Sequence, residues 1–359
     1  MKKTNKKIIV AMSGGVDSSV VASLLSKEYT GIMGIFLNFW KDSDEKSANE
    51  NKCCSIKSLM DARTIASKFG FKFYTLNFSE KFKKDIVDYF LEEYENGRTP
   101  NPCVKCNKFI KLGYLIERAK ELGYNYVASG HYASIKKVGS KYKLYKAKDE
   151  LKDQSYFLYT LNQKQLSYLL FPLGEYKKTE VRKIAKSMGL EVATKSDSQE
   201  ICFVAGKTHN DFLKKHLELV PGKIKDVSGK ILGSHSGLPL YTLGQRKGIE
   251  LGGNGPFYVV ELDYKTNTLI VSNTHDDLNI LKDEFIIENT NWISGLEPKF
   301  PLKTTVVIRY HHKPVACLVN KIKNDLFEVK LDSRQRAVTP GQSAVFYEND
   351  EVLGGGIIK

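Results

Sequence analysis

An apolar run near the start of the chain leads into a pair of glycines and then into a second apolar periodicity. The run covers residues 8–12, and the next residues read Ser13-Gly14-Gly15-Val16-Asp17-Ser18-Ser19. This order is typical of a buried strand, a tight loop and the first turn of a helix. Paired glycines let backbone N–H groups turn toward one point, which the positive end of the helix also faces. The loop is therefore predicted to bind an anion, and we expect a nucleotide phosphate.

This loop differs from a Walker A motif because it lacks the Gly-Lys-Ser/Thr ending whose lysine reaches the terminal phosphates. It resembles the pyrophosphate loop of ATP pyrophosphatases, which cut ATP between the α and β phosphates and activate an oxygen as an adenylate. A glycine turn with a serine cap and no ligand is the simpler alternative. The order of strand, loop and helix favours the phosphate-binding interpretation.

Strands and helices alternate after the loop. Apolar periodicity predicts helices at 18–27, 56–69 and 80–95, and strands at 31–37 and 71–76. Such alternation is typical of a parallel sheet, whose ligands lie beyond the carboxyl ends of the strands. A further strand runs into Gly130 and His131, where a base or ribose could approach, although a core or capping histidine is commoner. Ala11, Leu37 and Gly130 are expected along one edge of the sheet.

Length and composition limit the class of protein. At 359 residues the chain is long enough for two or three domains, and its 42% apolar residues suit a globular core. The apolar runs are shorter than a membrane span, and the run behind the basic start ends too early for a secretion signal. We therefore expect a cytoplasmic protein with no membrane partner.

The net charge of +14 suggests a nucleic-acid partner. Lysine supplies most of this charge, and a lysine bias can also arise from genome composition. Arginine is more informative because its planar fork grips phosphate through two parallel hydrogen bonds. Arg98, Arg246 and Arg309 all lie in motif-like stretches. The charge therefore gives a mild preference for nucleic-acid binding.

Six cysteines are too few and too unevenly spaced for a disulfide scaffold in a chain of this length. The adjacent pair Cys53-Cys54 would make a poor chelate and is interpreted as structural or loop thiols. Cys103 and Cys106 follow the stiff stretch Gly97-Arg98-Thr99-Pro100-Asn101-Pro102. This stretch is predicted to be a loop that leads into a helix at about Asn107.

Cys106 would then lie near a helix N-terminus, between Lys105 and Lys108, and these neighbours lower the pKa of a thiol. The spacing of Cys103 and Cys106 is also half of a metal or iron–sulfur site, and a pair of small buried side chains is a third interpretation. We favour a reactive thiol over a cluster ligand. Simple packing ranks last, because a charged, proline-rich loop rarely holds core cysteines.

Cys202 lies between the apolar residues Ile201 and Phe203. On these neighbours alone it would be interpreted as a buried structural cysteine. The presence of Cys103 and Cys106 in the same chain raises the case for a functional role. The sequence assigns no role to Cys317.

The alternation of strands and helices ends near Gly206, after a hairpin pattern at 135–147. Short β-like runs follow, with a second hairpin pattern at 257–271 and a last group of runs at 304–347. We expect an α/β parallel-sheet domain at 1–205, a small mixed or β-rich domain at 206–280 and a β-barrel at 281–359. In the barrel, Arg309-Tyr310 pairs a phosphate fork with a stacking ring, which suits RNA, although a solvated strand end fits these two residues equally well.

Six motifs occur in a fixed order along the chain. They are the phosphate loop, Gly97-Arg98-Thr99-Pro100-Asn101-Pro102, Ser129-Gly130-His131-Tyr132-Ala133, Lys152-Asp153-Gln154-Ser155-Tyr156-Phe157, Gln199-Glu200-Ile201-Cys202-Phe203 and Tyr241-Thr242-Leu243-Gly244-Gln245-Arg246-Lys247-Gly248. Over nearly the whole chain this set resembles the bacterial tRNA-specific 2-thiouridylases. The phosphate loop alone would indicate only the ATP pyrophosphatase superfamily, whereas the ordered set is highly specific.

The resemblance implies a role for individual residues. ATP would be bound by Ala11, Met12, Ser13, Gly14, Gly15, Val16, Asp17, Ser18, Leu37 and Gly130. The tRNA would contact Asn101, Pro102, Cys103, Lys152, Asp153, Gln154, Arg309 and Tyr310, the first three near the target base. Cys106 would be the nucleophile and Cys202 the carrier of a persulfide.

The resemblance also implies a reaction on the wobble uridine of tRNAs for lysine, glutamate and glutamine. ATP, with magnesium, would adenylate the C2 oxygen and release pyrophosphate. A sulfur donor, either a cysteine desulfurase or a sulfur-relay protein, would load Cys202, and Cys106 and Cys202 would close into a disulfide as AMP leaves.

Three alternatives to this reaction stay open. Some family members have Asp at the place of Cys103, so an iron–sulfur cluster on Cys103, Cys106 and Cys202 could replace the persulfide. No other metal ligands are predicted. The second alternative is another pyrophosphate-loop ligase, such as a tRNA lysidine synthase. The third is a non-catalytic tRNA-binding protein.

Overall fold

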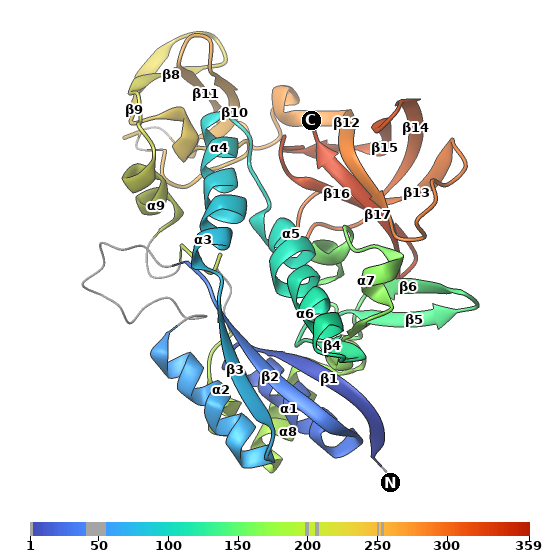
Figure 1. The fold of residues 1–359 in the computed structure, drawn as a ribbon. Coiled ribbons are helices and arrows are strands. Elements are labelled where there is room, and N and C mark those ends of the chain that lie inside the picture. The colour runs from blue at the N-terminus through green and yellow to red at the C-terminus, as the bar shows by residue number, and fades with distance from the viewer. Residues whose placement is uncertain (1–2, 41–54, 198–200, 205–207, 250, 253–254) are drawn as a thin grey trace.

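The computed structural model describes residues 3–40, 55–197, 201–204, 208–249, 251–252 and 255–359. The Cys53-Cys54 pair, whose role was predicted above, lies outside the described residues, as do Gln199 and Glu200. Figure 1 shows three parts: a parallel sheet with helices at the bottom, a small central sheet at the upper left and a barrel at the upper right. The expected order of fold classes is therefore confirmed.

The first part is a five-stranded parallel sheet, as the alternating pattern predicted. Its strand order is β3-β2-β1-β4-β7, and every neighbouring pair is parallel. The strands are β1 (Thr4–Met12), β2 (Tyr29–Asn38), β3 (Lys72–Asn77), β4 (Tyr126–Ala128) and β7 (Leu169–Leu170). The strands predicted at 31–37 and 71–76 correspond to β2 and β3.

Helices cover both faces of this sheet, because successive strand residues point to opposite sides. Ile8 and Val10 face the layer formed by α1 (Val16–Glu28), α2 (Ile56–Phe69) and α8 (Lys178–Ser187). Ile9 faces the other way, into the largest buried cluster. The helices predicted at 18–27 and 56–69 correspond to α1 and α2.

Two long helical runs form the layer on the second face. One passes through α3 (Ser79–Phe82), a π-helical segment (Lys83–Asp88) and α4 (Tyr89–Glu95), and it matches the helix predicted at 80–95. The other passes through α5 (Pro102–Cys106), a π-helical segment (Asn107–Tyr114) and α6 (Leu115–Glu121). The prediction that this second helix begins at Asn107 was wrong. It begins at Pro102, because proline at the first helical position lacks only an N–H that would have no partner there.

The central part begins with α9 (His209–His216) and continues into a four-stranded sheet of order β10-β11-β8-β9. The strands are β8 (Gly222–Asp226), β9 (Ile231–His235), β10 (Tyr258–Asp263) and β11 (Thr268–Ser272). Strands β8 and β11 pair in parallel and the other pairs are antiparallel. The hairpin predicted at 257–271 corresponds to β10 and β11.

The last part is a closed antiparallel barrel, because its first strand pairs with both β15 and its last strand β17. The strands are β12 (Leu281–Trp292), β13 (Leu302–Val307), β14 (Val315–Lys323), β15 (Leu326–Arg336), β16 (Ser343–Glu348) and β17 (Glu351–Ile358). The hairpin of β5 (Ser134–Val138) and β6 (Lys141–Tyr145) also adds to β17, where Leu144 pairs with Val352. The hairpin was predicted, but its pairing with the barrel was not.

Short turns complete the described chain. They are α7 (Gln163–Leu166) and 3₁₀ turns at Ser155–Leu158, Pro172–Glu175, Glu191–Thr194, Leu238–Leu240 and Leu278–Ile280. No helix in the described ranges combines the length and the apolar character that crossing a membrane requires.

The barrel core generates a stability prediction. Phe327 on β15 is fully buried, and its ring packs on those of Trp292 and Phe300 with centroids 5.9 Å and 5.1 Å away. Phe327→Ala should destabilise the barrel by about 3–5 kcal/mol because it leaves a cavity. Ile322→Ala, at a 53% exposed position of β14, is the control and should change stability by less than about 0.5 kcal/mol. Hydrogen exchange of the barrel strands measures both, and equal protection in the two variants would contradict the prediction.

Candidate functional site

The loop after β1 has the geometry that its glycines predicted. Gly14 has a φ of +70°, and a Cβ at this position would lie only 2.0 Å from the carbonyl oxygen of Ser58 in α2. Gly15 precedes α1 in an extended conformation. The hydroxyl of Ser18 accepts a 3.1 Å hydrogen bond from the backbone N–H of Ser13. The loop thus lies between the first turns of α1 and α2, and Gly15 at the start of α1 provides no side-chain cap, a helix end whose N–H groups suit an anion.

The other residues expected around a nucleotide lie at the same edge of the sheet. Ala11 and Met12 end β1, Leu37 lies near the end of β2, and Gly130 follows β4. The strand registers bring these ends to one level. A Cβ on Gly130 would lie 3.0 Å from the backbone nitrogen of Ser18. The backbone at Gly130 therefore passes directly beside the first turn of α1.

Two lysines from much later in the chain reach this loop. The Nζ of Lys178 lies 2.7 Å from both carboxylate oxygens of Asp17, which also accepts a 2.8 Å hydrogen bond from the Tyr132 hydroxyl. The Nζ of Lys195 donates to the carbonyl oxygen of Gly14 at 2.9 Å. Sequence reasoning missed both lysines, because no local pattern marks partners that are 161 and 181 residues apart. They place positive charge beside a loop that lacks the Walker A lysine.

Asp197 gathers three cations around one carboxylate. Its oxygens lie 2.8 Å from Lys152, 2.9 Å from Lys178 and 2.7 Å from Arg182. Burial alone would raise the pKa of this carboxyl, but hydrogen bonds from Lys152 and Lys178 outweigh burial and lower the pKa of Asp197 to about 2. Since Lys178 also holds Asp17, one ionic network joins the phosphate loop to the residues that precede Cys202 in the sequence.

The predicted tRNA contacts Lys152, Asp153 and Gln154 are tied into the fold. Asp153 accepts hydrogen bonds from the backbone N–H and the hydroxyl of Ser155, and burial raises the pKa of its carboxyl. The side chain of Gln154 accepts from the Tyr132 N–H at 3.0 Å, while its own N–H donates to the Tyr132 carbonyl at 2.8 Å. These contacts fix the segment beside the phosphate loop, and RNA contact there stays a prediction.

Predicted tRNA contacts from two other parts of the chain lie together. Asn101 precedes α5 and is close to the hydroxyl of Tyr156. Burial raises the pKa of Tyr156 above its ordinary value, and the hydrogen bond with Asn101 offsets part of this rise. The ring of Tyr310 packs on Phe157 and Tyr156, with centroids 4.5 Å and 6.1 Å away. Burial lowers the pKa of the adjacent Arg309. The barrel therefore makes an aromatic contact with the turn at Ser155–Leu158, whose Tyr156 is also close to Asn101.

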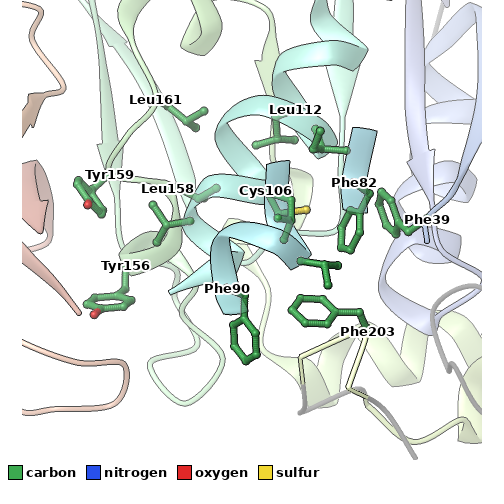
Figure 2. Close-up of a cluster of buried hydrophobic side chains, with 14 of the residues drawn as sticks. Phe39, Phe82, Phe90, Cys106, Leu112, Tyr156, Leu158, Tyr159, Leu161 and Phe203 are labelled. Atoms are coloured by element: carbon green, nitrogen blue, oxygen red, sulfur yellow. The ribbon is translucent and has the colours of Figure 1, made fainter. Parts of the chain in front are cut away.

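Cys106 and Cys202 pack against one buried cluster although they are far apart in the sequence. Cys106 is 3% exposed, and Figure 2 shows it among side chains that include Phe82, Phe90 and Phe203. Cys202 is half-buried and packs against the same cluster. The structure thus brings the two predicted catalytic cysteines to one region.

The surroundings of Cys106 differ from the prediction in two respects. Cys106 ends α5 and is buried, instead of lying at the start of a helix that begins at Asn107. The ammonium of Lys105 lies 3.5 Å from the centroid of the Tyr89 ring, and burial lowers the pKa of both Lys105 and Lys108. Of the neighbouring predicted contacts, Pro102 is buried and Cys103 is half-buried.

Within the described ranges, no group of three His, Cys, Asp or Glu side chains is arranged to hold a metal ion. The iron–sulfur alternative therefore stays a prediction for direct iron analysis. Cys317 is buried in the barrel core, and burial raises the pKa of its thiol to about 12. The Nδ1 of His131 lies 2.7 Å from the Ser129 hydroxyl, and burial, assisted by the charge of Lys111, lowers the pKa of His131 to about 3. His131 is therefore neutral at pH 7.

Fold and site together define a nucleotide-binding α/β protein with a pyrophosphate-type loop, followed by a small β-rich part and a barrel. Family models match in the same order: a tRNA methyl transferase HUP domain at 6–206, a tRNA methyl transferase PRC-barrel domain at 210–273 and an aminomethyltransferase β-barrel domain at 282–358. We propose domain boundaries at 1–205, 206–280 and 281–359.

Full-length relatives agree with these matches. The chain is 44% identical over 361 residues to the tRNA-specific 2-thiouridylase MnmA 2 of Clostridium tetani, with 100% of both chains covered. It is 44% identical over 363 residues to the tRNA-specific 2-thiouridylase MnmA 1 of Thermoanaerobacter pseudethanolicus, with 99% of both covered. A solved NMN synthetase from Francisella tularensis is a distant likeness, with 17% identity, 58% of this chain and 72% of that chain covered, and a TM-score of 0.35. The chain belongs to the tRNA-specific 2-thiouridylase family of tRNA-modifying enzymes.

The phosphate loop generates a prediction with a matched control. Gly14→Ala should destabilise the protein by more than about 1–2 kcal/mol, because an L-residue is strained at this φ and its Cβ would displace the backbone at Ser58. Gly15→Ala should cost less than about 0.5 kcal/mol, because its φ is −93° and the nearest atom to its Cβ is 3.4 Å away. Urea unfolding compares the two variants, and equal midpoints would show that the loop tolerates a side chain at Gly14.

The Asp197 network predicts a pH dependence of stability. A carboxyl whose pKa is lowered in the folded state stabilises the protein above its unfolded pKa of about 4. That contribution is lost as the pH falls through the folded value of about 2. Unfolding free energy measured between pH 5 and pH 2 should therefore fall more steeply for the wild type than for Asp197→Asn. Parallel curves would show that the three cations do not stabilise this carboxylate.

Proposed function

We propose that this protein is an ATP-dependent sulfurtransferase that replaces the C2 oxygen of the wobble uridine of tRNA with sulfur. The full-length similarity to enzymes named tRNA-specific 2-thiouridylases supports the reaction. The observation that carries it lies within the domain of the phosphate loop, where Cys106 and Phe203, the neighbour of Cys202, belong to one buried cluster (Figure 2). Sulfur transfer with disulfide closure needs two thiols that can meet. A protein that only binds tRNA needs no such pair of thiols.

In the first step, the loop and the edge of the sheet hold ATP. Residues Ala11 to Ser18 surround the phosphates through backbone N–H groups, and Leu37 and Gly130 line the approach of the nucleoside. Gly14 and Gly130 let the loop pack closely on Ser58 and on the first turn of α1, which brings the start of this helix to the proposed phosphate site. Magnesium would balance the phosphate charge. Lys178 and Lys195 hold the loop in shape through Asp17 and the Gly14 carbonyl.

In the second step, sulfur replaces the activated oxygen. The terminal sulfur of a persulfide on Cys202 bonds to C2 of the adenylated uridine, and the bond from C2 to oxygen breaks as AMP leaves. The thiolate of Cys106 attacks the Sγ of Cys202, so the sulfur–sulfur bond of the persulfide breaks and its outer sulfur stays on the base. The two cysteines end as a disulfide, which a thiol reductant must reopen.

The partners follow from this chemistry. A tRNA for lysine, glutamate or glutamine would contact Asn101, Cys103, the 152–154 segment and Arg309-Tyr310, with the target uridine near α5. A sulfur donor, a cysteine desulfurase or a relay protein, would load Cys202. We expect these reactions to take place in the cytoplasm.

Cysteine variants separate the steps of the reaction. Cys106→Ser and Cys202→Ser should each abolish 2-thiouridine formation, measured by mass spectrometry of the tRNA nucleosides. Both should still release pyrophosphate in a single turnover with tRNA, because adenylation precedes sulfur transfer. Cys317→Ala, which alters a buried cysteine of the barrel, is the control and should retain thiolation.

Three other results would each reject part of this proposal. Thiolation by both serine variants would exclude the two-cysteine mechanism and favour another pyrophosphate-loop ligase. Absence of tRNA-dependent AMP and pyrophosphate from the wild type would favour a binding protein. Stoichiometric iron that activity requires, found after anaerobic purification, would replace the persulfide with a cluster on Cys103, Cys106 and Cys202.

A further inference from the structure

The loop between the central strands β9 and β10 presents two cations that the proposed mechanism does not use. Arg246 and Lys247 lie in the Thr242–Gly248 stretch, and both are exposed. Among the residues that the structure describes, neither side chain has an acidic partner. Other arginines are engaged: Arg98 pairs with the buried carboxylate of Glu93, and Arg182 pairs with Asp197. Two adjacent unpaired cations on one loop are therefore available to an external anion.

The loop that carries these cations is braced from within. The side-chain oxygen of Gln245 accepts a 3.0 Å hydrogen bond from the N–H of Thr242, and its side-chain nitrogen donates to the carbonyl of Lys247 at 2.9 Å. The backbone N–H of Gln245 donates to the Thr242 carbonyl, and its carbonyl accepts from the N–H of Val259 in β10. The backbone that presents Arg246 and Lys247 is thus fixed before a ligand arrives, which lowers the entropy cost of binding.

Besides the 152–154 segment, two groups of residues are proposed to contact tRNA: residues 101–103 and Arg309-Tyr310. The braced loop lies beside both groups. The hydroxyls of Thr242 and Thr99 are 3.4 Å apart, and Thr99 is two residues before Asn101. On the other side, Arg336 donates to the carbonyl of Gly244 at 3.2 Å, and Arg309 donates to the carbonyl of Arg336 at 3.1 Å. The loop is therefore continuous with the start of α5 and with Arg309-Tyr310.

We propose that Arg246 and Lys247 bind phosphates of the tRNA strand next to the target nucleotide. This inference rests on the proposed function, because it deepens the description of the same tRNA site. Arginine and lysine both bind phosphodiesters by charge, and arginine adds a two-pronged hydrogen bond. The continuity with Arg309-Tyr310, which the proposed function assigns to tRNA contact, favours RNA over an acidic protein as the occupant.

The salt dependence of binding tests this assignment. Affinity of the full chain for tRNA is measured from 50 to 200 mM salt for the wild type, Arg246→Ala, Lys247→Ala and the double variant. Each lost phosphate contact should lower the slope of log affinity against log salt by about 0.7–0.9 and account for about threefold in affinity across this range. The double variant should lose about twice as much slope, and Arg246→Lys should keep most of it.

Two controls isolate the loop. Lys230→Ala removes an exposed lysine next to β9 in the same domain and should leave the slope unchanged. ATP affinity should be the same in all variants, because no hydrogen bond or ion pair joins residues 242–248 to residues 13–19 in the described part of the chain. A double variant that binds tRNA with the wild-type slope overturns the inference and leaves the proposed function intact. Failure of the wild type to bind tRNA, or a flat salt response, overturns both.

One further result would assign the loop to a protein. If the double variant binds tRNA normally but loses thiolation only when a sulfur-donor protein supplies the sulfur, the cations dock that donor and the phosphate assignment is wrong. Supplying a small-molecule persulfide in place of the donor makes the comparison, because its outer sulfur can pass to the Cys202 thiolate without an added oxidant.

Discussion

The packing of four buried phenylalanine rings holds together the parts of the chain on which sulfur chemistry depends. Phe82 and Phe90 come from the α3–α4 run, Phe203 follows Cys202, and Phe212 belongs to α9. The ring of Phe203 lies 5.8 Å, 5.1 Å and 5.4 Å from the other three. Burial of each ring contributes on the order of 1.5–3 kcal/mol. Because Phe203 is at the centre, the residue beside it is brought to the cluster that also contains Cys106.

A second constraint acts on the other side of Cys202. Asp197, five residues earlier, is held by Lys152, Lys178 and Arg182. Of the described residues on either side of Cys202 in the sequence, Asp197 is therefore held by charge and Phe203 by apolar packing. Lys178 contacts Asp17 as well, so the same lysine contributes to the shape of the phosphate loop. The phosphate loop and Asp197 thus share one side chain.

The sequence was sufficient where the signal is local. Periodicity predicted β2, β3, α1, α2 and the α3–α4 run. A glycine pair between an apolar strand and a helix-like apolar pattern predicted the phosphate loop. The start of α5 was misjudged because Pro102 was interpreted as a helix breaker, whereas proline is compatible with a first helical position. Sequence reasoning missed the pairing of β6 with β17. It also missed the contacts of Lys178 with Asp17 and of Lys195 with Gly14. All of these are tertiary contacts between residues more than 150 positions apart.

The barrel also holds the segment that leads to Cys106. The N–H of Thr99 donates to the carbonyl of Pro340 at 2.8 Å, and the side chain of Gln342 donates to the carbonyl of Thr99 at 3.0 Å. The central part holds the same residue through Thr242. A short stretch without regular structure would otherwise sample many conformations. Its attachment to both later parts adds to the contacts that Asn101 and Cys106 make within the first domain. The position of the proposed nucleophile therefore depends on contacts from all three parts of the chain.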